Sequence, residues 1–332
     1  MKKLVSLGEI LMRLTCENYL RFSQADKFEV VYGGSEANVL ITAANFGLSA
    51  DFITVVPDNE LGQTAVSDLK INRVDINNIQ YRGERMGLYF MERGAINRSG
   101  KIIYGRTNSA FSEIKREWFN WKEILQDCNW FHWSGITPAI SQNAADVCRD
   151  AIETAAEMGI KISADLNYRA NLWQYESNPQ EIMKEFVSKS DILLAGQYAC
   201  QQFFGFRKED SSNKELAERL KETFPKLKKI AITNRKEINA SHHKWSATLF
   251  NGSEVLESDL YDIFPIVDRV GTGDSFMGAL IYGLQNYDDQ KALDFATAAS
   301  SLKHTIPGDF NRVTKEEVLK LVEGDRSGRI SR

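Results

Sequence analysis

A glycine-rich segment near the carboxyl end of the chain combines residue types that suit phosphate chemistry. Gly271, Thr272, Gly273 and Asp274 follow a strand-like run and precede an apolar helical stretch. Glycines let backbone N–H groups approach a phosphate at a helix N-terminus. A carboxylate at that place can accept the proton of a hydroxyl group held against the phosphate. We therefore predict that Asp274 is a catalytic base and that Gly271, Thr272 and Gly273 form a phosphate loop with it.

Taken alone, the same tetrapeptide is also compatible with a simple helix start that Asp274 caps. A base at the positive end of a helix is weak, but a loose phosphoryl-transfer transition state needs little proton removal until late in the reaction. A second feature near the amino end favours the functional interpretation. There, Gly33 and Gly34 precede a helical pattern whose first turn carries Ser35 and Asn38. A second polar helix start indicates a substrate site.

Together, Gly33-Gly34 with Asn38 and the segment DRVGTGD resemble the two signature regions of the ribokinase/PfkB sugar kinases. The segments GEILMRL, NWFHWSGITPA, DLNYRANLW, VDRVGTGDSF and LKHTIPGDFN are similar to the 2-keto-3-deoxygluconate kinase branch of that family. The resemblance extends along nearly the whole chain. It implies an enzyme that uses ATP and Mg²⁺ to phosphorylate 2-keto-3-deoxygluconate to 2-keto-3-deoxy-6-phosphogluconate.

The resemblance also implies which residues surround the two substrates. The residues expected at the sugar acid are Gly33, Gly34, Asn38, Tyr89, Tyr104, Arg106 and Arg169. The residues expected at the nucleotide are Thr233, Arg235, Gly271, Gly273, Lys303 and His304. A packed aromatic is the alternative interpretation for Tyr89, and a solvated edge charge is the alternative for Arg106.

Arg169 is the cation that would select an acid. Ligands of α/β sheets bind beyond the carboxyl ends of strands, and Arg169 stands just past the strand-like run KISADL. A guanidinium binds a carboxylate through two N–H groups. The alternative is a solvent-exposed loop arginine, which is the commoner place for this residue.

Two segments depart from the family pattern. The glycine-rich T-x-G-x-x-G form is missing around Thr233, and Gly196, Gln197, Tyr198 and Ala199 stand where the family has an acidic N-E-E-D/E motif. Loss of an outer-shell carboxylate weakens metal affinity by about 10- to 100-fold. We therefore expect lower activity or a different Mg²⁺ demand. No histidine has metal-ligand spacing, so no protein metal ligand is predicted.

Other functions remain open at this stage. A kinase of the same fold that acts on fructose, ribose or a nucleoside would not need Arg169 to meet a carboxylate. A non-catalytic sugar-acid sensing protein would keep the pocket without turnover, although the presence of Asp274 argues against it. No G-x-x-x-x-G-K-[ST], HRD or DFG sequence occurs, which excludes a Walker-type cradle and a protein kinase.

The elements that must position these residues alternate between strand-like and helical patterns. This alternation predicts an α/β fold with a doubly wound, mostly parallel sheet flanked by helices, in one domain over residues 1–332. Residues about 10–32 and 86–108 break the rhythm and predict extra strands away from the main sheet. The family resemblance implies a ribokinase-like fold in which these strands form a small lid over the sugar and a homo-oligomer interface.

Composition narrows the possible partners and location. Of 332 residues, 41 are Lys or Arg and 45 are Asp or Glu, giving a net charge of −4 without a basic stripe, so a nucleic-acid partner is not expected. The amino-terminal run predicts a strand, not a signal peptide, and no apolar stretch is long enough for a membrane. Four separated cysteines predict reduced thiols in a soluble cytoplasmic protein. His132 is predicted in the core, and His242 and His243 in an exposed turn.

Overall fold

The largest element is a ten-stranded sheet that runs through the whole molecule. The structure is a computed structural model that describes residues 3–206 and 212–328; the remaining residues of the predicted domain lie outside the described residues. The sheet order is β15-β14-β13-β12-β11-β10-β1-β4-β6, and β16 pairs with β14. Pairs from β6 to β13 are parallel, whereas β14 pairs antiparallel with β13, β15 and β16. The strands are β1 (Lys3–Leu7), β4 (Ser49–Ile53), β6 (Val74–Asp75), β10 (Trp130–Ser134), β11 (Lys161–Asp165), β12 (Ile192–Leu194), β13 (Lys229–Asn239), β14 (His242–Phe250), β15 (Val255–Glu257) and β16 (Tyr261–Ile263).

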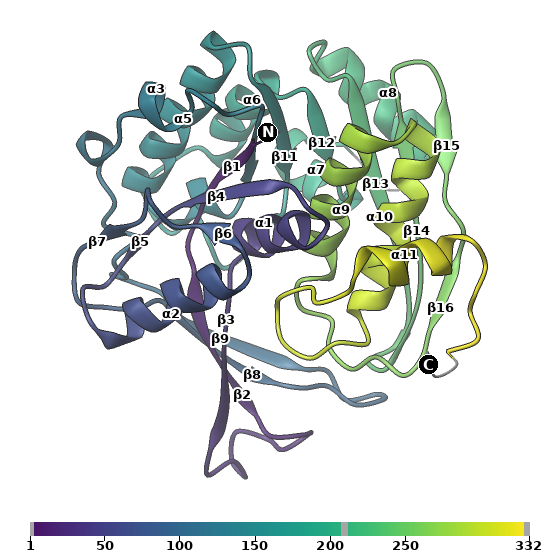
Figure 1. Cartoon of the computed structure of the whole chain (residues 1–332), viewed down its shortest axis with the longest axis horizontal. Helices are drawn as coiled ribbons and strands as arrows, with labels where there is room; N and C mark the ends of the chain where they lie inside the picture. Colours follow the sequence, from purple (N-terminus) through teal and green to yellow (C-terminus); the bar gives the residue numbers. More distant parts are fainter. Residues whose placement is uncertain (1–2, 207–211, 329–332) are drawn as a thin grey trace.

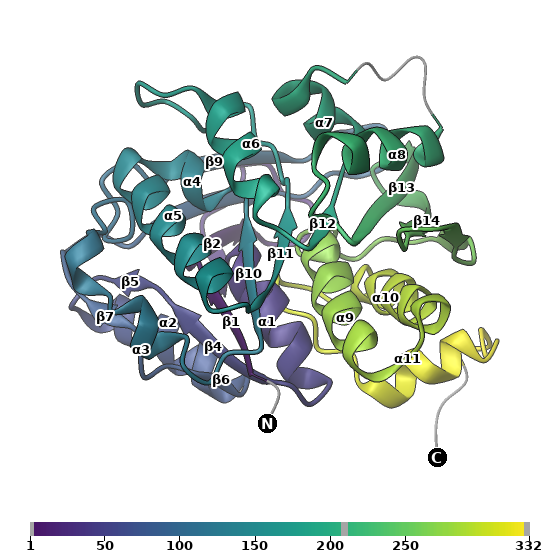
Figure 2. The same ribbon diagram turned by 90° about the horizontal axis from the view of Figure 1, so that it is seen from above.

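Helices cover both faces of this sheet (Figure 2). One apolar core includes Leu40, Phe276 and Phe295, and it packs beneath α1 (Ser35–Asn45), α2 (Glu60–Ile71), α9 (Thr272–Asn286), α10 (Asp289–Lys303) and α11 (Lys315–Val322). The other core packs beneath α3 (Trp121–Ile124), α5 (Gln142–Glu157), α6 (Pro179–Ser188), α7 (Gln197–Phe204) and α8 (Asn213–Thr223). The short elements η1 (Arg116–Trp118) and α4 (Thr137–Ile140) precede α3 and α5, and β5 (Val55–Val56) pairs with β7 (Gln80–Tyr81). The predicted α/β, doubly wound, mostly parallel ribokinase-like fold is confirmed.

Local sequence explains where these elements begin. All five residues of β10 are buried, as expected for a parallel strand covered on both faces. The Ser141 side chain accepts a hydrogen bond from the amide of Ala144 and caps α5. Asn178 caps α6, where Pro179 occupies the first turn without losing a needed N–H group. Strands therefore end, and helices start, at one edge of the sheet in successive units.

A second sheet projects from the body (Figure 1). Its order is β3-β2-β8-β9, with antiparallel β2–β3 and β8–β9 pairs and a parallel β2–β8 pair. The strands are β2 (Leu11–Cys16), β3 (Phe28–Gly33), β8 (Leu88–Glu92) and β9 (Lys101–Gly105). They lie in the two segments whose pattern departs from the alternation of the main sheet.

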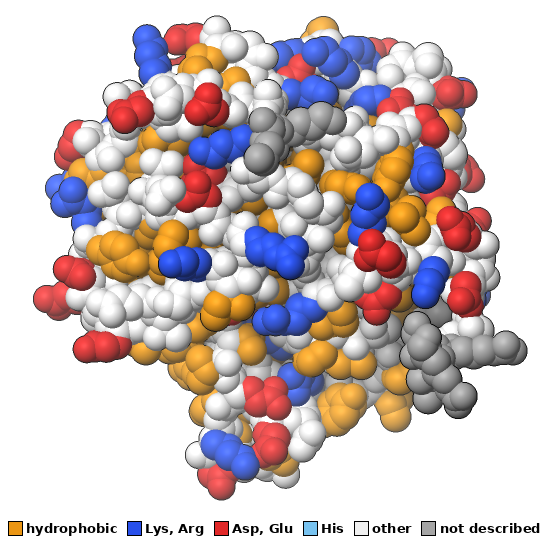
Figure 3. Space-filling view, viewed as in Figure 1, with side chains coloured by type: hydrophobic (Ala, Val, Ile, Leu, Met, Phe, Trp, Pro, Cys, Tyr) orange, Lys and Arg blue, Asp and Glu red, His pale blue; other side chains and the backbone are white. Residues whose placement is uncertain are grey.

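The two faces of the projecting sheet differ in chemistry. The pairing register aligns Val30, Leu14, Phe90 and Ile103 across all four strands on one face, which we call the outer face. Val30 and Ile103 are 53% and 56% exposed, and hydrophobic side chains are visible on the projecting part in Figure 3. Side chains on the opposite face point toward the body because neighbours along a strand alternate. An apolar row therefore remains uncovered in the single chain.

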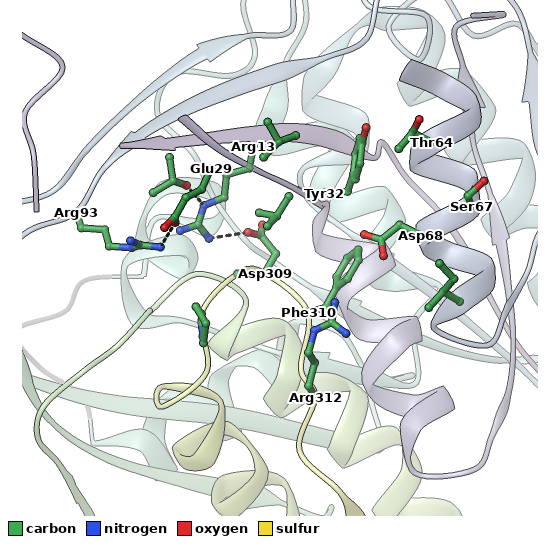
Figure 4. Close-up of a pocket in the computed structure, with 16 residues that line it drawn as sticks. Arg13, Glu29, Tyr32, Thr64, Ser67, Asp68, Arg93, Asp309, Phe310 and Arg312 are labelled. Atoms are coloured by element: carbon green, nitrogen blue, oxygen red, sulfur yellow. Dashed lines mark hydrogen bonds and ion pairs between the residues drawn. The ribbon is translucent and has the colours of Figure 1, made fainter. Parts of the chain in front are cut away.

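A buried ion network joins this sheet to the body (Figure 4). Arg13 on β2 donates from Nη2 to Asp268 Oδ2 at 2.6 Å and from Nη1 to Asp309 Oδ1 at 2.8 Å. Its Nε atom donates to Thr15 Oγ1 at 2.7 Å. The Tyr89 hydroxyl on β8 donates to the other oxygen of Asp309 at 2.5 Å. Two strands of the projecting sheet are thus tied to two loops of the carboxyl-terminal half.

The histidine predictions had mixed outcomes. His132 is buried and its Nδ1 atom lies 2.9 Å from Ser163 Oγ, which confirms the core prediction. The prediction of an exposed turn at His242 and His243 was wrong, because the turn lies at residues 240–241 and both histidines belong to β14. His242 is half-buried and His243 is fully buried. All four cysteines are buried free thiols, as predicted. In the part of the chain that the structure describes, no helix combines the length and apolar character that crossing a membrane requires.

Replacing Arg13 with Met tests the network. The substitution leaves two buried carboxylates without their cation, so we expect the free energy of unfolding to fall by about 3–5 kcal/mol. Urea titration followed by circular dichroism measures this change. Arg116→Met is the matched control, because its ion pair with Asp150 is on the surface and the Arg116 side chain is 63% exposed. Equal effects of the two substitutions would contradict a special role of the buried network.

Candidate active site

One cavity of about 1090 Å³ opens between the projecting sheet and the carboxyl ends of β11 and β12. Pockets for one small ligand occupy about 300–1,000 Å³, so this cavity has room for two molecules. Its lining contains the following predicted residues: Gly33, Gly34, Asn38, Tyr89, Tyr104, Arg106, Arg169, Thr233, Arg235, Gly271, Thr272, Gly273 and Asp274. Residues far apart in sequence meet here because the parallel strands end at this edge.

Asp274 lies in the first turn of α9, where two residues of α1 hold its carboxylate. Oδ1 accepts a hydrogen bond from Ser35 Oγ at 2.9 Å, and Oδ2 accepts one from Asn38 Nδ2 at 2.7 Å. The first N–H groups of a helix lack intrahelical partners. The two predicted helix starts therefore converge, with a carboxylate of fixed orientation beside amides that can bind an anion.

Asn167 extends this arrangement to the end of β11, although the sequence analysis did not select it. Its Nδ2 atom donates to Ser35 Oγ at 2.9 Å, and its backbone N–H donates to Asp165 Oδ1 at 3.0 Å. Asn167 has a φ of 34°, a region that asparagine tolerates better than most residues. Its position in the segment DLNYR, just after a buried strand, was the available signal.

Glycine is required at two close approaches around Asp309. A Cβ atom at Gly33 would lie 2.1 Å from Asp309 Oδ2, and one at Gly271 would lie 2.1 Å from the Asp309 carbonyl oxygen. Gly271 also has a φ of 77°, a left-handed conformation that other residues rarely adopt. By contrast, nothing lies within 4 Å of the Cβ position of Gly273, so that residue faces open space in the cavity.

Burial raises the pKa values of two carboxyl groups in the cavity, those of Asp274 and Asp165. It raises the pKa of Asp274 to about 6, while the hydrogen bonds from Asn38 and Ser35 oppose this rise. Burial and the neighbouring charge of Asp274 raise the pKa of Asp165 to about 7. At neutral pH Asp274 is therefore mainly ionised, yet it is a stronger proton acceptor than an ordinary aspartate.

Two arginines that line the cavity, Arg106 and Arg169, differ in their partners. Arg106 donates from Nε to Glu9 Oε2 at 2.8 Å and also pairs with Glu9 through Nη2. Glu9 accepts a further hydrogen bond from Ser109 Oγ at 2.5 Å. Arg169 is exposed and donates to the backbone oxygen of Tyr168 at 3.1 Å. No described acidic side chain forms an ion pair with it, although its charge partly opposes the rise in pKa of Asp165 and Asp274. Sequence reasoning missed Glu9, which neutralises Arg106 and leaves Arg169 able to bind an acid.

The two predicted tyrosines stand at the same end. Tyr89 is buried and its hydroxyl is committed to Asp309, so its ring forms the wall. Tyr104 is paired with Tyr89 across β8 and β9, is 41% exposed, and has its ring centroid 5.8 Å from that of Tyr89. An aromatic wall thus lies beside Arg106, whose guanidinium is 5.9 Å from the centroid of the Tyr104 ring.

The other half is formed by β13, β14 and the loop before α9. Thr233 and Arg235 line it as predicted, together with Arg269, which the sequence analysis did not select. The start of α7 contributes Gly196 and Ala199 to the same wall. Within residues 3–206 and 212–328, no group of three or more His, Cys, Asp or Glu side chains could hold a metal ion.

Two predicted residues, Lys303 and His304, do not line the cavity. Lys303 is fully buried, and its Nζ atom donates to the carbonyl oxygens of Ile306 and Gly308 at 3.2 and 2.8 Å. His304 is also buried, with Nδ1 2.8 Å from the Ser300 carbonyl oxygen. Neither belongs to the cavity lining, so the structure does not bring them to the nucleotide side. Thr272 donates its hydroxyl to the Arg269 carbonyl oxygen at 3.0 Å, which leaves its backbone amide for a ligand.

A second cavity of about 590 Å³ lies behind the projecting sheet (Figure 4). Arg13, Tyr32, Asp68, Asp309 and Arg312 are among its lining residues. Asp309 lines both cavities, so the buried pair of Arg13 and Asp309 belongs to the partition between them. The candidate base and the two helix starts line only the larger cavity, which is therefore the candidate active site.

Comparisons with known proteins agree with this geometry. The profile of the pfkB family carbohydrate kinases matches residues 1–314. The crystal structure of 2-dehydro-3-deoxygluconokinase from Thermotoga maritima is similar over 98% of this chain and 100% of that chain, with 43% identity and a TM-score of 0.94. The 2-dehydro-3-deoxygalactonokinase of Haloferax volcanii is 28% identical over 98% of both chains. A putative ribokinase II from E. coli, in complex with ATP and Mg²⁺, has 21% identity over 97% of this chain and 99% of its own, with a TM-score of 0.82.

The hydrogen bond from Asn38 to Asp274 can be tested by titration. Asn38→Ala removes a donor that favours the ionised carboxylate, so the pKa of Asp274 should rise from about 6 by about one to two further units. Carbon-13 NMR of labelled aspartate measures the value, with Asp274→Asn identifying the signal. Asn45→Ala is the control, because this α1 residue bonds to the Asn311 carbonyl oxygen. An unchanged pKa in Asn38→Ala would mean that this contact does not control the carboxylate.

Proposed function

The chain belongs to the pfkB family of carbohydrate kinases, and from this premise we propose that it transfers the terminal phosphoryl group of ATP to 2-keto-3-deoxygluconate. The product would be 2-keto-3-deoxy-6-phosphogluconate. The relatives named for 2-dehydro-3-deoxy sugar acids support an acceptor of this class. Gluconate and galactonate forms of the acid differ in the configuration of one hydroxyl group, and the gluconate form is our choice on the stronger structural similarity.

The observation that carries this proposal is the unequal pairing of two arginines that line the cavity, Arg106 and Arg169. Arg106 forms an ion pair with Glu9, whereas Arg169 forms none with a described acidic side chain and acts on Asp165 and Asp274 only at longer range. A sugar acid supplies the missing negative charge through a bidentate contact. A neutral sugar such as fructose or ribose would leave that cation without a partner.

Asp274 would act on the acceptor hydroxyl group. Its carboxylate accepts the hydroxyl proton while the new oxygen–phosphorus bond forms and the bond between the terminal phosphorus and ADP breaks. Ser35 and Asn38 hold the carboxylate in one orientation toward the cavity. The free N–H groups at the start of α9 stabilise the charge on the transferred phosphoryl oxygens.

The residues present fit a magnesium ion that arrives with the nucleotide. Mg²⁺ keeps several waters and uses one or two carboxylates plus substrate phosphates, so it does not need a protein cage. Asp165 lines the cavity and forms no ion pair with a described side chain, although the charge of Arg169 acts on it at longer range, which suits such a role. When bound, the ion neutralises phosphate charge. The missing acids at Gly196 and Ala199 would lower its affinity.

We also propose that two copies associate through the outer face of the projecting sheet. The row of Val30, Leu14, Phe90 and Ile103 is apolar and uncovered, and such sheet faces are normally packed against another layer. A second copy offers the same row, which a twofold axis would bring face to face. The projecting sheet would then serve both as lid and as interface.

Substitution at the outer face tests the association. Ile103→Lys places like charges opposite each other at a twofold interface, so the dimer should dissociate at micromolar protein concentration. Sedimentation equilibrium measures the mass. Leu61→Lys on α2 is the control, because this residue is 45% exposed on another surface. A parent chain that sediments as a monomer would refute the proposal directly.

Replacing Asp274 with Asn tests the base. The fold and ATP binding should remain, while turnover should fall by roughly 100- to 10,000-fold. In the parent, the rate should fall as the pH drops through about 6, because protonated Asp274 cannot accept a proton. ADP release with the keto acid, gluconate, fructose and ribose as acceptors gives both results. Near-normal turnover of the variant would remove Asp274 from this role.

Replacing Arg169 with Met tests the choice of acid. A charged contact contributes about 1.5–3 kcal/mol, so the Michaelis constant for the keto acid should rise by roughly 10- to 100-fold. The constant for any neutral sugar that the parent accepts should change little. Arg326→Met is a control on a distant surface, where Arg326 pairs with Asp259. Equal effects on acid and neutral sugar would contradict the carboxylate contact.

A further inference from the structure

The half of the cavity formed by β13, β14 and the loop before α9 has more arginine than acidic side chains. Arg235 lies on β13, Arg269 lies two residues before Gly271, and both side chains are 36% exposed. Among the described residues, the carboxylate that pairs with them is that of Glu237. Arg235, Arg269 and Glu237 all line the cavity. This wall therefore has an excess of positive charge next to the start of α9.

Glu237 contacts both arginines, but neither contact is short. Its Oε1 atom lies 3.5 Å from Nη1 of Arg269 and 3.9 Å from Nη1 of Arg235. A tight charge-assisted hydrogen bond has a length of about 2.7–2.9 Å. The Glu237 side chain is 57% exposed, so water competes for it. One anionic oxygen thus occupies the place where two guanidinium groups converge, without satisfying them.

The surroundings fix Arg235 more firmly than Glu237. The guanidinium of Arg235 lies over the Trp245 ring at 5.4 Å from its centroid, and Trp245 is buried. Burial together with the charges of Arg269 and Arg169 lowers the pKa of Arg235. The neighbouring His243 contributes no charge at neutral pH, because burial and the charges of Arg235 and Arg269 lower its pKa to about 4. The guanidinium groups of Arg235 and Arg269 therefore create a positively charged position that Glu237 neutralises only in part.

We propose that Arg235 and Arg269 form a clamp for the phosphate groups of the nucleotide, and that Glu237 is the internal anion that a phosphate displaces. The inference rests on the proposed kinase function and adds the side chains that bind the donor phosphates. The glycine-rich T-x-G-x-x-G form is missing at this position of β13, so side-chain cations take the place of backbone amides. A phosphate carries three oxygens that can meet two guanidinium groups, which one loosely held carboxylate cannot do.

Calorimetric titration with ADP and with adenosine tests the clamp. The titrations are done without the sugar acid, so that they measure nucleotide binding alone. Arg269→Met should weaken ADP binding by roughly 10- to 100-fold and change adenosine binding less than about twofold. Arg235→Met should also weaken ADP binding, but Arg269→Met is decisive because Arg235 also lies over Trp245. Arg116→Met, which removes a cation far from the cavity, should bind ADP like the parent. Adenosine binding confirms that each variant is folded.

Glu237→Gln tests the displaced anion and gives a result in the opposite direction. Removing the competing charge should tighten ADP binding by about 2- to 10-fold at low salt, with a smaller gain at high salt. Glu257→Gln is the control, since this exposed residue on β15 does not line the cavity. In the double variant with Arg269→Met, most of the gain should disappear, because the two groups act on one site.

The outcomes separate this inference from the proposed function. Weaker ADP binding in Arg269→Met, tighter binding in Glu237→Gln and a lost gain in the double variant support the clamp, even if the keto acid proves not to be the acceptor. Unchanged or weaker ADP binding in Glu237→Gln, or an equal loss of adenosine and ADP binding in Arg269→Met, overturns the clamp. Phosphorylation of the keto acid would still stand in that case.

Discussion

A buried guanidinium must have anionic partners, and this requirement at Arg13 controls much of the active-site geometry. Asp268 and Asp309 provide these partners from two different loops, so the projecting sheet, the loop before α9 and the loop after α10 are fixed together. The same Asp309 receives the Tyr89 hydroxyl and excludes a side chain at Gly33 and Gly271. One ion network therefore fixes the projecting sheet relative to the loop at Gly271–Asp274, and one of its carboxylates, that of Asp309, also lines the larger cavity.

The arginines of the larger cavity differ in how closely an acidic side chain neutralises their charge. This difference indicates which of them can bind a negatively charged ligand. Glu9 pairs closely with Arg106, Glu237 is shared loosely by Arg235 and Arg269, and Arg169 has no described ion-pair partner. Asp165 and Asp274 line the same cavity, and the charge of Arg169 acts on both. Such a distribution suits two negatively charged ligands that approach a carboxylate from opposite ends of one cavity.

The sequence alone predicted the fold and the contact region of Asn38 and Asp274 in the candidate site, because both depend on local sequence patterns. Strand and helix periodicity predicted the doubly wound sheet, and glycine pairs before polar helix turns predicted where Asp274 and Asn38 would lie. Glu9 and Asn167 escaped prediction because their roles depend on partners distant in the chain, Arg106 and Ser35. Lys303 lies in a segment with a clear family pattern, but its side chain turns into the protein to satisfy loop carbonyls. Side-chain direction at a helix end cannot be read from residue type alone.

The Arg13 network also determines when the active site can form during synthesis. Arg13 meets partners that stand 255 and 296 positions later in the chain. Domains emerge from the ribosome with the amino-terminal part first, and long-range contacts form only after both ends are free. A nascent chain that lacks the segment around Asp309 therefore holds Arg13 without its counter-ions and has no partition beside the cavity. Competence for phosphoryl transfer should appear in a single late step, so prematurely terminated chains would not compete with the finished enzyme for sugar or nucleotide.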